Sequence, residues 1–217
     1  NMNESILSKV FWWMCVGLLV TFATGALLAS NPMMIVRLAS SLGGYGLVLI
    51  MVLEVVLVIV LSARIHKMNA MTAKICFLLY AFISGISFSS VFLAYDIGSV
   101  IWVFLASSLI FALFAFLGNK TSVNLNKIGT YFLMALLAAI VCTIINIFTQ
   151  SPTFDLIISI VMIIIFMGIT AYDVQSVKRL EGVMEDDNLA ILGALELYLD
   201  YINLFLQLLG LFGNSKD

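Results

Sequence analysis

The sequence predicts an all-α integral membrane protein, a bundle of seven transmembrane helices, on three grounds. Of the 217 residues, 63% are hydrophobic and only 10% are charged, whereas soluble domains carry about 25% charged residues. The apolar residues gather in runs of about 20, the length that an α-helix needs to cross a bilayer. The runs lack the ten-residue alternation of a membrane β-barrel, so helices remain as the structure that satisfies the backbone in lipid.

Seven apolar runs follow one another along the chain, and a short polar connection separates each from the next. They cover approximately residues 10–30, 41–63, 75–95, 100–118, 130–149, 156–177 and 190–211. The GGYG segment at 43–46 is expected to loosen the start of the second run, because glycine weakens a helix. Because the connections are short, we expect a single transmembrane domain over residues 1–217.

Basic residues are distributed unevenly among the connections, and this predicts the orientation. The connections after the second, fourth and sixth runs carry Arg64, His66, Lys67, Lys74, Lys120, Lys127, Lys178 and Arg179. The other connections hold Arg37, Asp96 and Asp155. The positive-inside rule therefore predicts a cytoplasmic N-terminus and, after seven spans, a C-terminus outside. If the last run, which holds Glu196 and Asp200, is re-entrant, the C-terminus lies inside instead.

Several classes of function lack the residues they need. The net charge is −2 and no basic stripe is present, so a nucleic-acid partner is not expected. Cys15, Cys76 and Cys142 lie singly inside apolar runs, which is typical of packing residues and not of a metal site. His66 is the only histidine and cannot form a catalytic triad by itself. We expect no required cofactor and no enzymatic activity.

Carboxylates inside the apolar runs are the strongest functional signal in the chain. A charged side chain at the centre of a bilayer costs about 2.5–3.5 kcal/mol and is tolerated where it faces the bundle interior or water. Four such carboxylates are present: Glu54, Asp173, Glu196 and Asp200. In the last run, Glu196, Asp200, Asn203 and Gln207 are spaced to share one stripe of a helix. The stripe predicts a polar face turned toward partners; the alternative is hydrogen bonding between helices.

Asp173 and Asp200 are predicted to face each other in the cytoplasmic half of the membrane. Asp173 lies near the inner end of the sixth span, and Asp200 lies in the span that returns from that side. Two close carboxylates titrate as a unit, and their oxygens suit Ca²⁺. We therefore predict a pH sensor and a Ca²⁺ ligand pair. Arg64 is the cation expected to compete for either carboxylate; the alternative is a snorkelling anchor at the interface.

Glu54 lies near the middle of the second span, about 15 Å along the helix axis from Arg64. No lysine or arginine lies at a comparable depth in any span. We therefore expect Glu54 to be protonated or exposed to water in a cavity, and we predict that Glu54, Glu196 and Asn203 line an ion pathway. The alternative for Glu54 is a neutral, hydrogen-bonded carboxylic acid.

Two segments near the C-terminus resemble the Bax inhibitor-1 family, also called the transmembrane BAX inhibitor motif family. They are ITAYDVQSVKR in the sixth span and LELYLDYINLFLQLLGLFG in the seventh. Two further segments support the resemblance, LEVVLVIVLSAR in the second span and FISGISFSSVF in the third. The likeness covers essentially the whole chain and is strongest to small bacterial members, which implies the cell membrane of a bacterium.

The resemblance implies a seven-helix bundle in which the C-terminal helix is central, and a pH-sensitive calcium-leak channel. Asp173 and Asp200 match the di-aspartyl sensor of the family, Arg64 matches its latch, and Glu54 matches its second-span glutamate. Bacterial relatives can carry an arginine ten residues after the seventh-span aspartate, where this chain has Gly210. The implied partners are Ca²⁺ as the transported ion, protons and the lipid bilayer. A monomer would suffice for a pore, and the oligomeric state stays open.

Three other functions compete with a calcium leak. A proton-coupled cation transporter would use Glu54 and the aspartate pair as a relay, but no inverted repeat is evident. A non-conducting membrane regulator of stress or cell death is compatible with the sequence. An intramembrane aspartyl protease is disfavoured, because Asp200 follows LYL instead of a Gly-x-Gly motif and no Pro-Ala-Leu element exists. Both prolines, Pro32 and Pro152, are expected in external loops.

Overall fold

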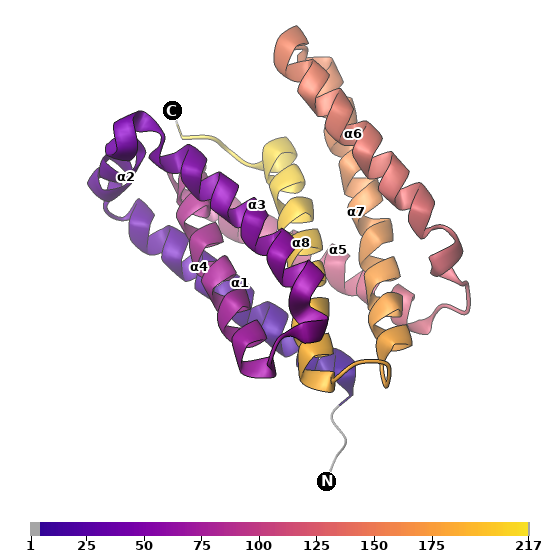
Figure 1. Cartoon of the computed structure of the whole chain (residues 1–217). Helices are drawn as coiled ribbons and strands as arrows, with labels where there is room; N and C mark the ends of the chain where they lie inside the picture. The colour runs from indigo at the N-terminus through magenta and orange to yellow at the C-terminus, as the bar shows by residue number, and fades with distance from the viewer. Residues whose placement is uncertain (1–4, 217) are drawn as a thin grey trace. The chain divides into compact units, whose positions relative to one another are not determined.

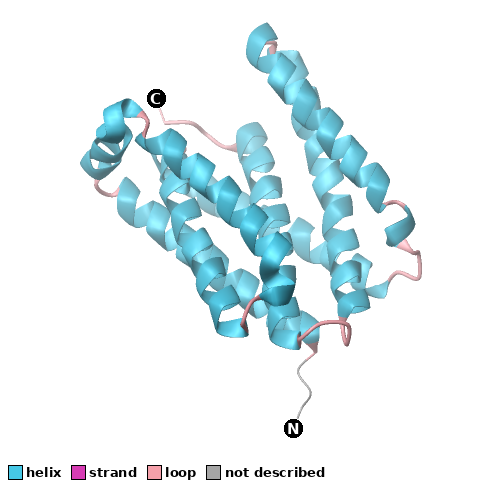
Figure 2. Ribbon diagram, viewed as in Figure 1, coloured by secondary structure: helices cyan, strands magenta, loops and turns pink. Residues whose placement is uncertain are grey.

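The computed structural model describes residues 5–216, which fold into eight α-helices and two short 3-10 helices, with no β-strand in that range. Figure 2 shows that helices make up almost all of this part of the chain. Their bounds are α1 (Ile6–Ala29), α2 (Pro32–Gly44), α3 (Gly46–Arg64), η1 (Ile65–Lys67), α4 (Ala70–Ala94), α5 (Ile97–Lys120), η2 (Leu125–Lys127), α6 (Gly129–Thr149), α7 (Pro152–Leu180) and α8 (Asp186–Phe212). Figure 1 labels the α-helices in this order.

Seven helices, all except α2, are long and apolar enough to cross a membrane. Their lengths run from 19 residues in α3 to 29 residues in α7, which meets the requirement of about 20 apolar residues per span. The predicted fold class, an all-α membrane protein with seven spans, is confirmed. Several helices extend beyond the apolar run that predicted them, because polar first and last turns continue the same backbone hydrogen bonding.

Both prolines begin helices, which corrects the expectation that they lie in loops. Pro32 stands in the first turn of α2 after Asn31, and Pro152 is the first residue of α7. The backbone N–H of Phe154 donates to the hydroxyl of Ser151 at 3.3 Å, which caps the start of α7. Proline suits the first helical turn, since it lacks an N–H that would find no partner there.

The α2 helix is an additional element that the hydropathy pattern did not predict. It has 13 residues, too few to span a bilayer, and none of them is buried. Its end is distorted, with Leu42, Gly43 and Gly44 at φ values of 51°, 72° and 94°. Left-handed backbone of this kind ends a helix and favours glycine. The second span therefore begins at Gly46, later than the residue 41 expected from the sequence.

The chain forms two compact units. The first contains α1 to α4 together with Leu180–Leu195 and the described residues from Ser215 onward. The second contains Ile97–Arg179 and Glu196–Asn214. The α8 helix contributes to both units, and 72% of its most apolar stretch is buried, the largest share among the seven spans.

In the first unit, α1 packs closely against α4. The hydroxyl of Thr21 donates to the backbone oxygen of Ala81 at 2.8 Å in a buried position. Gly85 permits the close approach, because a Cβ there would lie 2.5 Å from the Cβ of Thr24. The rings of Phe22 and Phe88 meet edge to face with centroids 5.0 Å apart. Small residues and one interhelical hydrogen bond thus hold the pair, as is usual for helices in lipid.

The start of α8 is tied to the connection between α3 and α4, also within the first unit. Asn188 is buried, and its side-chain N–H₂ donates to the backbone oxygens of Ile65 at 2.9 Å and Met68 at 3.0 Å. Both acceptors belong to a turn whose carbonyls have few helical partners. A single buried amide therefore fixes this turn against the first turn of α8.

In the second unit, α7 lies against glycines of two neighbouring helices. Gly118 of α5 meets the backbone of Ala171, and Gly129 of α6 meets the ring of Tyr172. Conversely, Gly168 of α7 meets the ring of Phe132 in α6, where a Cβ would lie 2.5 Å from the ring edge. These contacts leave little room for side chains between the helices.

Replacing Gly118 with alanine is expected to destabilise the protein, because the new Cβ would collide with the main chain of Ala171, which cannot rotate away. Overpacking of this kind costs about 1–3 kcal/mol. Thermal unfolding in detergent, followed by tryptophan fluorescence, measures the loss. Gly98→Ala in the same helix is the matched control, since a Cβ there meets nothing within 4 Å. Equal unfolding temperatures for the two variants would contradict the assignment.

Candidate functional site in α7 and α8

Asp173 and Asp200 come together within the second unit. Asp173 lies in α7 and Asp200 in α8, and their carboxyl groups are within hydrogen-bonding reach of each other. An ionised carboxylate only accepts hydrogen bonds, so a bond between two carboxyl groups requires one proton. The arrangement can therefore hold a proton between two acidic oxygens and change its charge when that proton leaves or a second one arrives.

Asp200 is the more enclosed of the two carboxylates. Only 4% of the residue is exposed, and its neighbours Leu197 and Leu204 are fully buried. Its Oδ2 atom has no hydrogen-bond partner among the described residues. Most buried polar atoms have a hydrogen-bond partner, so an atom without one is explained by a bound ion, a water molecule or a proton. Oδ2 is thus an acceptor available to a ligand.

Glu196 adds a third acidic group to this region. It lies one helical turn before Asp200, and it interacts electrostatically with both Asp173 and Asp200. Even so, no three side chains of the kinds that bind metals are grouped closely enough to hold an ion in the described part of the chain. Ca²⁺ takes six to eight oxygen ligands. The assignment of Asp173 and Asp200 as Ca²⁺ ligands stays a prediction.

The position of Asp173 is set by the two residues before it. Ala171 rests on the main chain at Gly118, and Tyr172 packs its ring on Gly129. The guanidinium of Arg179 lies 5.6 Å from the centre of the Tyr172 ring, within range of a cation–π interaction. Contacts on two sides of α7 therefore orient the helix and direct the carboxyl group of Asp173.

The position of Asp200 is set by the residue after it. The hydroxyl of Tyr201 donates to the backbone oxygen of Phe104 at 3.0 Å and lies 3.0 Å from the hydroxyl of Ser108. Its ring stacks on Phe205 and meets Phe111 edge to face. Because these contacts join α8 to α5, they fix the rotation of α8 at the level of Asp200.

Asn203 lies on the predicted stripe of α8 but uses its amide within the helix. Its side-chain N–H₂ donates to the backbone oxygen of Leu199 at 2.8 Å. Asn203 and Gln207 are both half-buried. The place of Asn203 in an ion pathway stays a prediction.

Glu54 has hydrogen-bond partners that were not predicted from the sequence. It lies in α3 of the first unit, half-buried, and forms side-chain hydrogen bonds with Ser84 and Ser87 of α4. Tyr80 joins the same group through a hydrogen bond with Ser84. Serines of the FISGISFSS segment supply these partners, not a lysine or arginine, and their place in an apolar span was the signal in the sequence. Glu54 is therefore a hydrogen-bonded carboxyl group; its neutral state and its place in an ion pathway stay predictions.

Arg64 is exposed at the C-terminal end of α3 in the first unit. It lines a pocket of about 530 Å³ together with Ala63, Lys67 and Met68. The pocket is basic, and its position at a helix end is compatible with either a latch or an interface anchor. The role of Arg64 as a latch stays a prediction.

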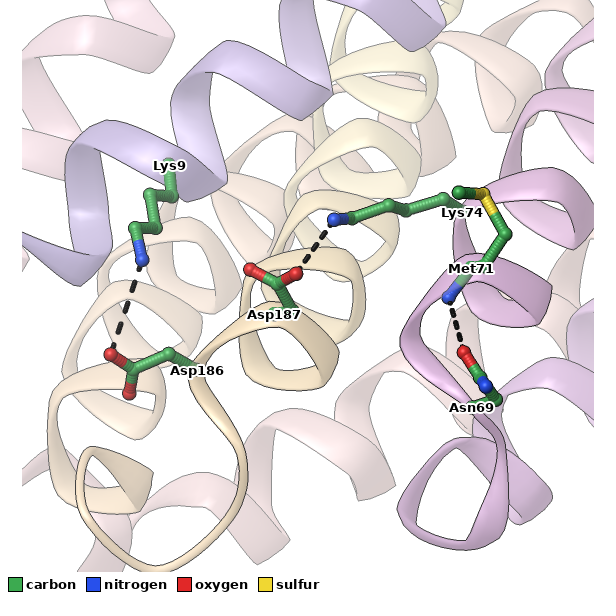
Figure 3. Close-up of polar contacts among 6 residues, drawn as sticks. All are labelled: Lys9, Asn69, Met71, Lys74, Asp186 and Asp187. Atoms are coloured by element: carbon green, nitrogen blue, oxygen red, sulfur yellow. Dashed lines mark hydrogen bonds and ion pairs between the residues drawn. The ribbon is translucent and has the colours of Figure 1, made fainter.

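A cluster of ion pairs at the start of α8 was not predicted from the sequence. We define the α8 ion-pair cluster as Lys9, Lys74, Asp186 and Asp187. The Nζ atom of Lys74 lies 2.7 Å from Oδ2 of Asp187, and the Nζ atom of Lys9 lies 4.0 Å from Oδ2 of Asp186. Figure 3 shows lysines from α1 and α4 reaching the two aspartates of the first turn of α8. Acidic residues are stabilised at this end of a helix.

Comparison with known proteins gives one family. A family model described as "Inhibitor of apoptosis-promoting Bax1" matches residues 3–217. The chain is similar to the inner membrane protein YbhL of Escherichia coli strain K12, with 34% identity over 98% of this chain and 93% of that protein. It is also similar to an uncharacterized protein of Borreliella burgdorferi, with 32% identity over 99% of this chain and 94% of that protein.

A further relative is an uncharacterized membrane protein of Streptococcus pyogenes serotype M3. It is 34% identical over 76% of this chain and 72% of the relative. The similarity to membrane proteins agrees with the seven apolar helices, which identifies a multi-pass membrane protein.

Proposed function

Because the chain belongs to the Bax inhibitor-1 family of membrane proteins, we propose that it forms a pH-sensitive leak for Ca²⁺ across the membrane. The observation that carries this proposal is the pairing of Asp173 with Asp200. One acidic oxygen of this pair is buried and has no partner among the described residues. A titratable pair at such a position is a suitable switch, since each proton changes its charge by one unit.

The proposed gating follows from the charge of the pair. With one shared proton the pair carries a single negative charge and attracts a cation. Protonation of both aspartates removes that charge, whereas loss of the shared proton doubles it. We propose that Arg64 is the cation held in the closed state, by analogy with the family, and that mild acid releases it. The leak then declines in stronger acid, because a neutral pair no longer attracts Ca²⁺.

The remaining features of the proposal come from the sequence. Ca²⁺ is the transported ion and protons are the regulating ligand, with no resident cofactor and no enzymatic activity. Glu54, Glu196 and Asn203 are proposed to line the pathway. The distribution of basic residues supports a cytoplasmic N-terminus and a C-terminus outside the cell membrane.

The direct test is Ca²⁺ flux into proteoliposomes loaded with a Ca²⁺-sensitive dye, measured from about pH 8 to about pH 5. We expect passive flux that rises several-fold in mild acid and falls again at the lowest pH. Protein-free liposomes are the control. Uphill movement of Ca²⁺ driven by an imposed pH gradient would instead indicate a proton-coupled transporter. Absence of any flux at every pH would refute the leak and favour a non-conducting regulator.

A further inference from the structure

A pocket in the first unit has no part in the proposed leak. It measures about 590 Å³ and is lined by Ser8, Lys9, Trp12, Trp13 and Asp187. It shares Lys9 and Asp187 with the α8 ion-pair cluster; Figure 3 shows these two residues at the beginning of α1 and α8. The lining therefore combines an ammonium group, a carboxylate, a hydroxyl and two indole rings in one small space.

The two ion pairs leave hydrogen-bonding capacity unused. At 4.0 Å, the contact between Lys9 and Asp186 is too long for a hydrogen bond, and within residues 5–216 the ammonium of Lys9 donates to no other group. Asp187 bonds Lys74 through Oδ2 at 2.7 Å, and its second carboxylate oxygen points away from Lys74 in Figure 3. A carboxylate can accept several hydrogen bonds. The pocket thus offers one cationic donor and one anionic acceptor.

The charges of the α8 ion-pair cluster balance, with two lysines against two aspartates. Lys9 and Lys74 both act electrostatically on Asp187. A net anionic ligand would bring an uncompensated charge beside the two carboxylates. A ligand with one positive and one negative group adds no net charge and can pair with both signs. The balance therefore favours a zwitterion.

The two tryptophans place the pocket at the depth of lipid head groups. Trp12 is 67% exposed, and it lies near the start of the first span. Tryptophan concentrates at the interface between lipid and water, where its ring contacts apolar chains and its N–H remains hydrated. The ring of Trp13 lies 5.7 Å from the ammonium of Lys74, which anchors this ring to the cluster.

From these features we propose that the pocket binds the head group of phosphatidylethanolamine. The phosphate contacts the ammonium of Lys9 and the hydroxyl of Ser8, and the primary ammonium donates to the free oxygen of Asp187. The acyl chains lie along the exposed face of Trp12. Phosphatidylcholine carries a trimethylammonium group that has no N–H to donate to Asp187. Phosphatidylglycerol has no cationic group and adds a net charge.

The test uses quenching of tryptophan fluorescence by lipids with brominated acyl chains. A Trp102→Phe background removes the third tryptophan, so that the signal comes from Trp12 and Trp13. The full-length protein in mixed micelles is titrated with brominated phosphatidylethanolamine, phosphatidylcholine or phosphatidylglycerol at low mole fraction. We expect half-maximal quenching by the ethanolamine lipid at an about fivefold lower mole fraction than by the other two.

Two aspartate variants then test whether the lipid preference depends on the carboxylate that lines the pocket. Asp187→Asn is expected to remove the preference for phosphatidylethanolamine. Asp155→Asn, at an exposed aspartate in the first turn of α7 and outside the α8 ion-pair cluster, is expected to retain it. Size-exclusion chromatography checks that both variants remain folded. In the Trp102→Phe protein with no change in the pocket, equal quenching by all three lipids would by itself overturn the proposal. An undiminished preference in folded Asp187→Asn would overturn it as well.

Discussion

Asp200→Asn is expected to remove the pH dependence of Ca²⁺ flux and to leave the fold intact. The amide has nearly the same shape as the carboxyl group of Asp200 but does not titrate in this range. Asp173→Asn is expected to act in the same way, because either change breaks the shared protonation of the pair. The ratio of flux at about pH 6 to flux at about pH 8 should fall from several-fold toward one in both variants.

The double variant and a control complete this experiment. Residues that act as a unit have non-additive effects, so Asp173→Asn combined with Asp200→Asn should resemble either single variant. Asp155→Asn is the matched control, since Asp155 is an exposed aspartate in the first turn of α7. A normal pH profile in both single variants would refute the switch and leave open a leak governed by other groups. Loss of the profile in the control would show a non-specific effect of charge.

Replacing Tyr201 with alanine is expected to cause the largest loss of stability in the second unit. Tyr201 is 2% exposed and contacts the rings of Phe104, Phe111 and Phe205. Truncation of a buried aromatic residue to alanine costs about 3–5 kcal/mol in protein cores. Tyr201→Phe keeps the ring and removes the hydroxyl that bonds the backbone oxygen of Phe104 and the hydroxyl of Ser108; each such hydrogen bond contributes about 0.5–1.5 kcal/mol.

Unfolding in detergent by heat or by sodium dodecyl sulfate ranks these variants. Tyr131→Ala is the matched control, because Tyr131 lies in α6 of the same unit and is 68% exposed. We expect Tyr131→Ala to be nearly as stable as the unmodified protein, Tyr201→Phe to be less stable, and Tyr201→Ala to be the least stable. A Tyr201→Ala protein as stable as the control would contradict the role of Tyr201 as an anchor for α8.

The sequence predicted the helices well wherever one apolar run formed one span. It failed at α2, because a helix of 13 residues with Arg37 in its middle produces no long apolar run. The start of the second span was placed too early for a related reason. The apolar residue Leu42 counts toward a hydropathy run, although its left-handed backbone interrupts the helix.

The carboxylates were found from the sequence, but most of their partners were not. A charge within an apolar run is visible without a structure, which is why Asp173, Asp200 and Glu54 were singled out. Hydrogen bonds between Glu54 and serines of α4 depend on how two helices are rotated, and no local pattern specifies that rotation. The pair of Lys74 and Asp187 is separated by 113 residues in the chain, so sequence spacing gave no indication of it.

The close contacts around α7 have a consequence for how the sequence can vary. Ala171 meets main-chain atoms at Gly118, and Tyr172 meets the main chain at Gly129. Glycine presents only main-chain atoms, so α7 rests on the backbones of α5 and α6 at these two positions. The direction of the Asp173 carboxyl group is therefore nearly independent of the lipid-facing side chains of α5 and α6. In a scan of all substitutions, the exposed positions of these helices should accept many residues. Position 118 should accept almost none, because any side chain there would meet the main chain of Ala171, although Gly118 carries no functional group.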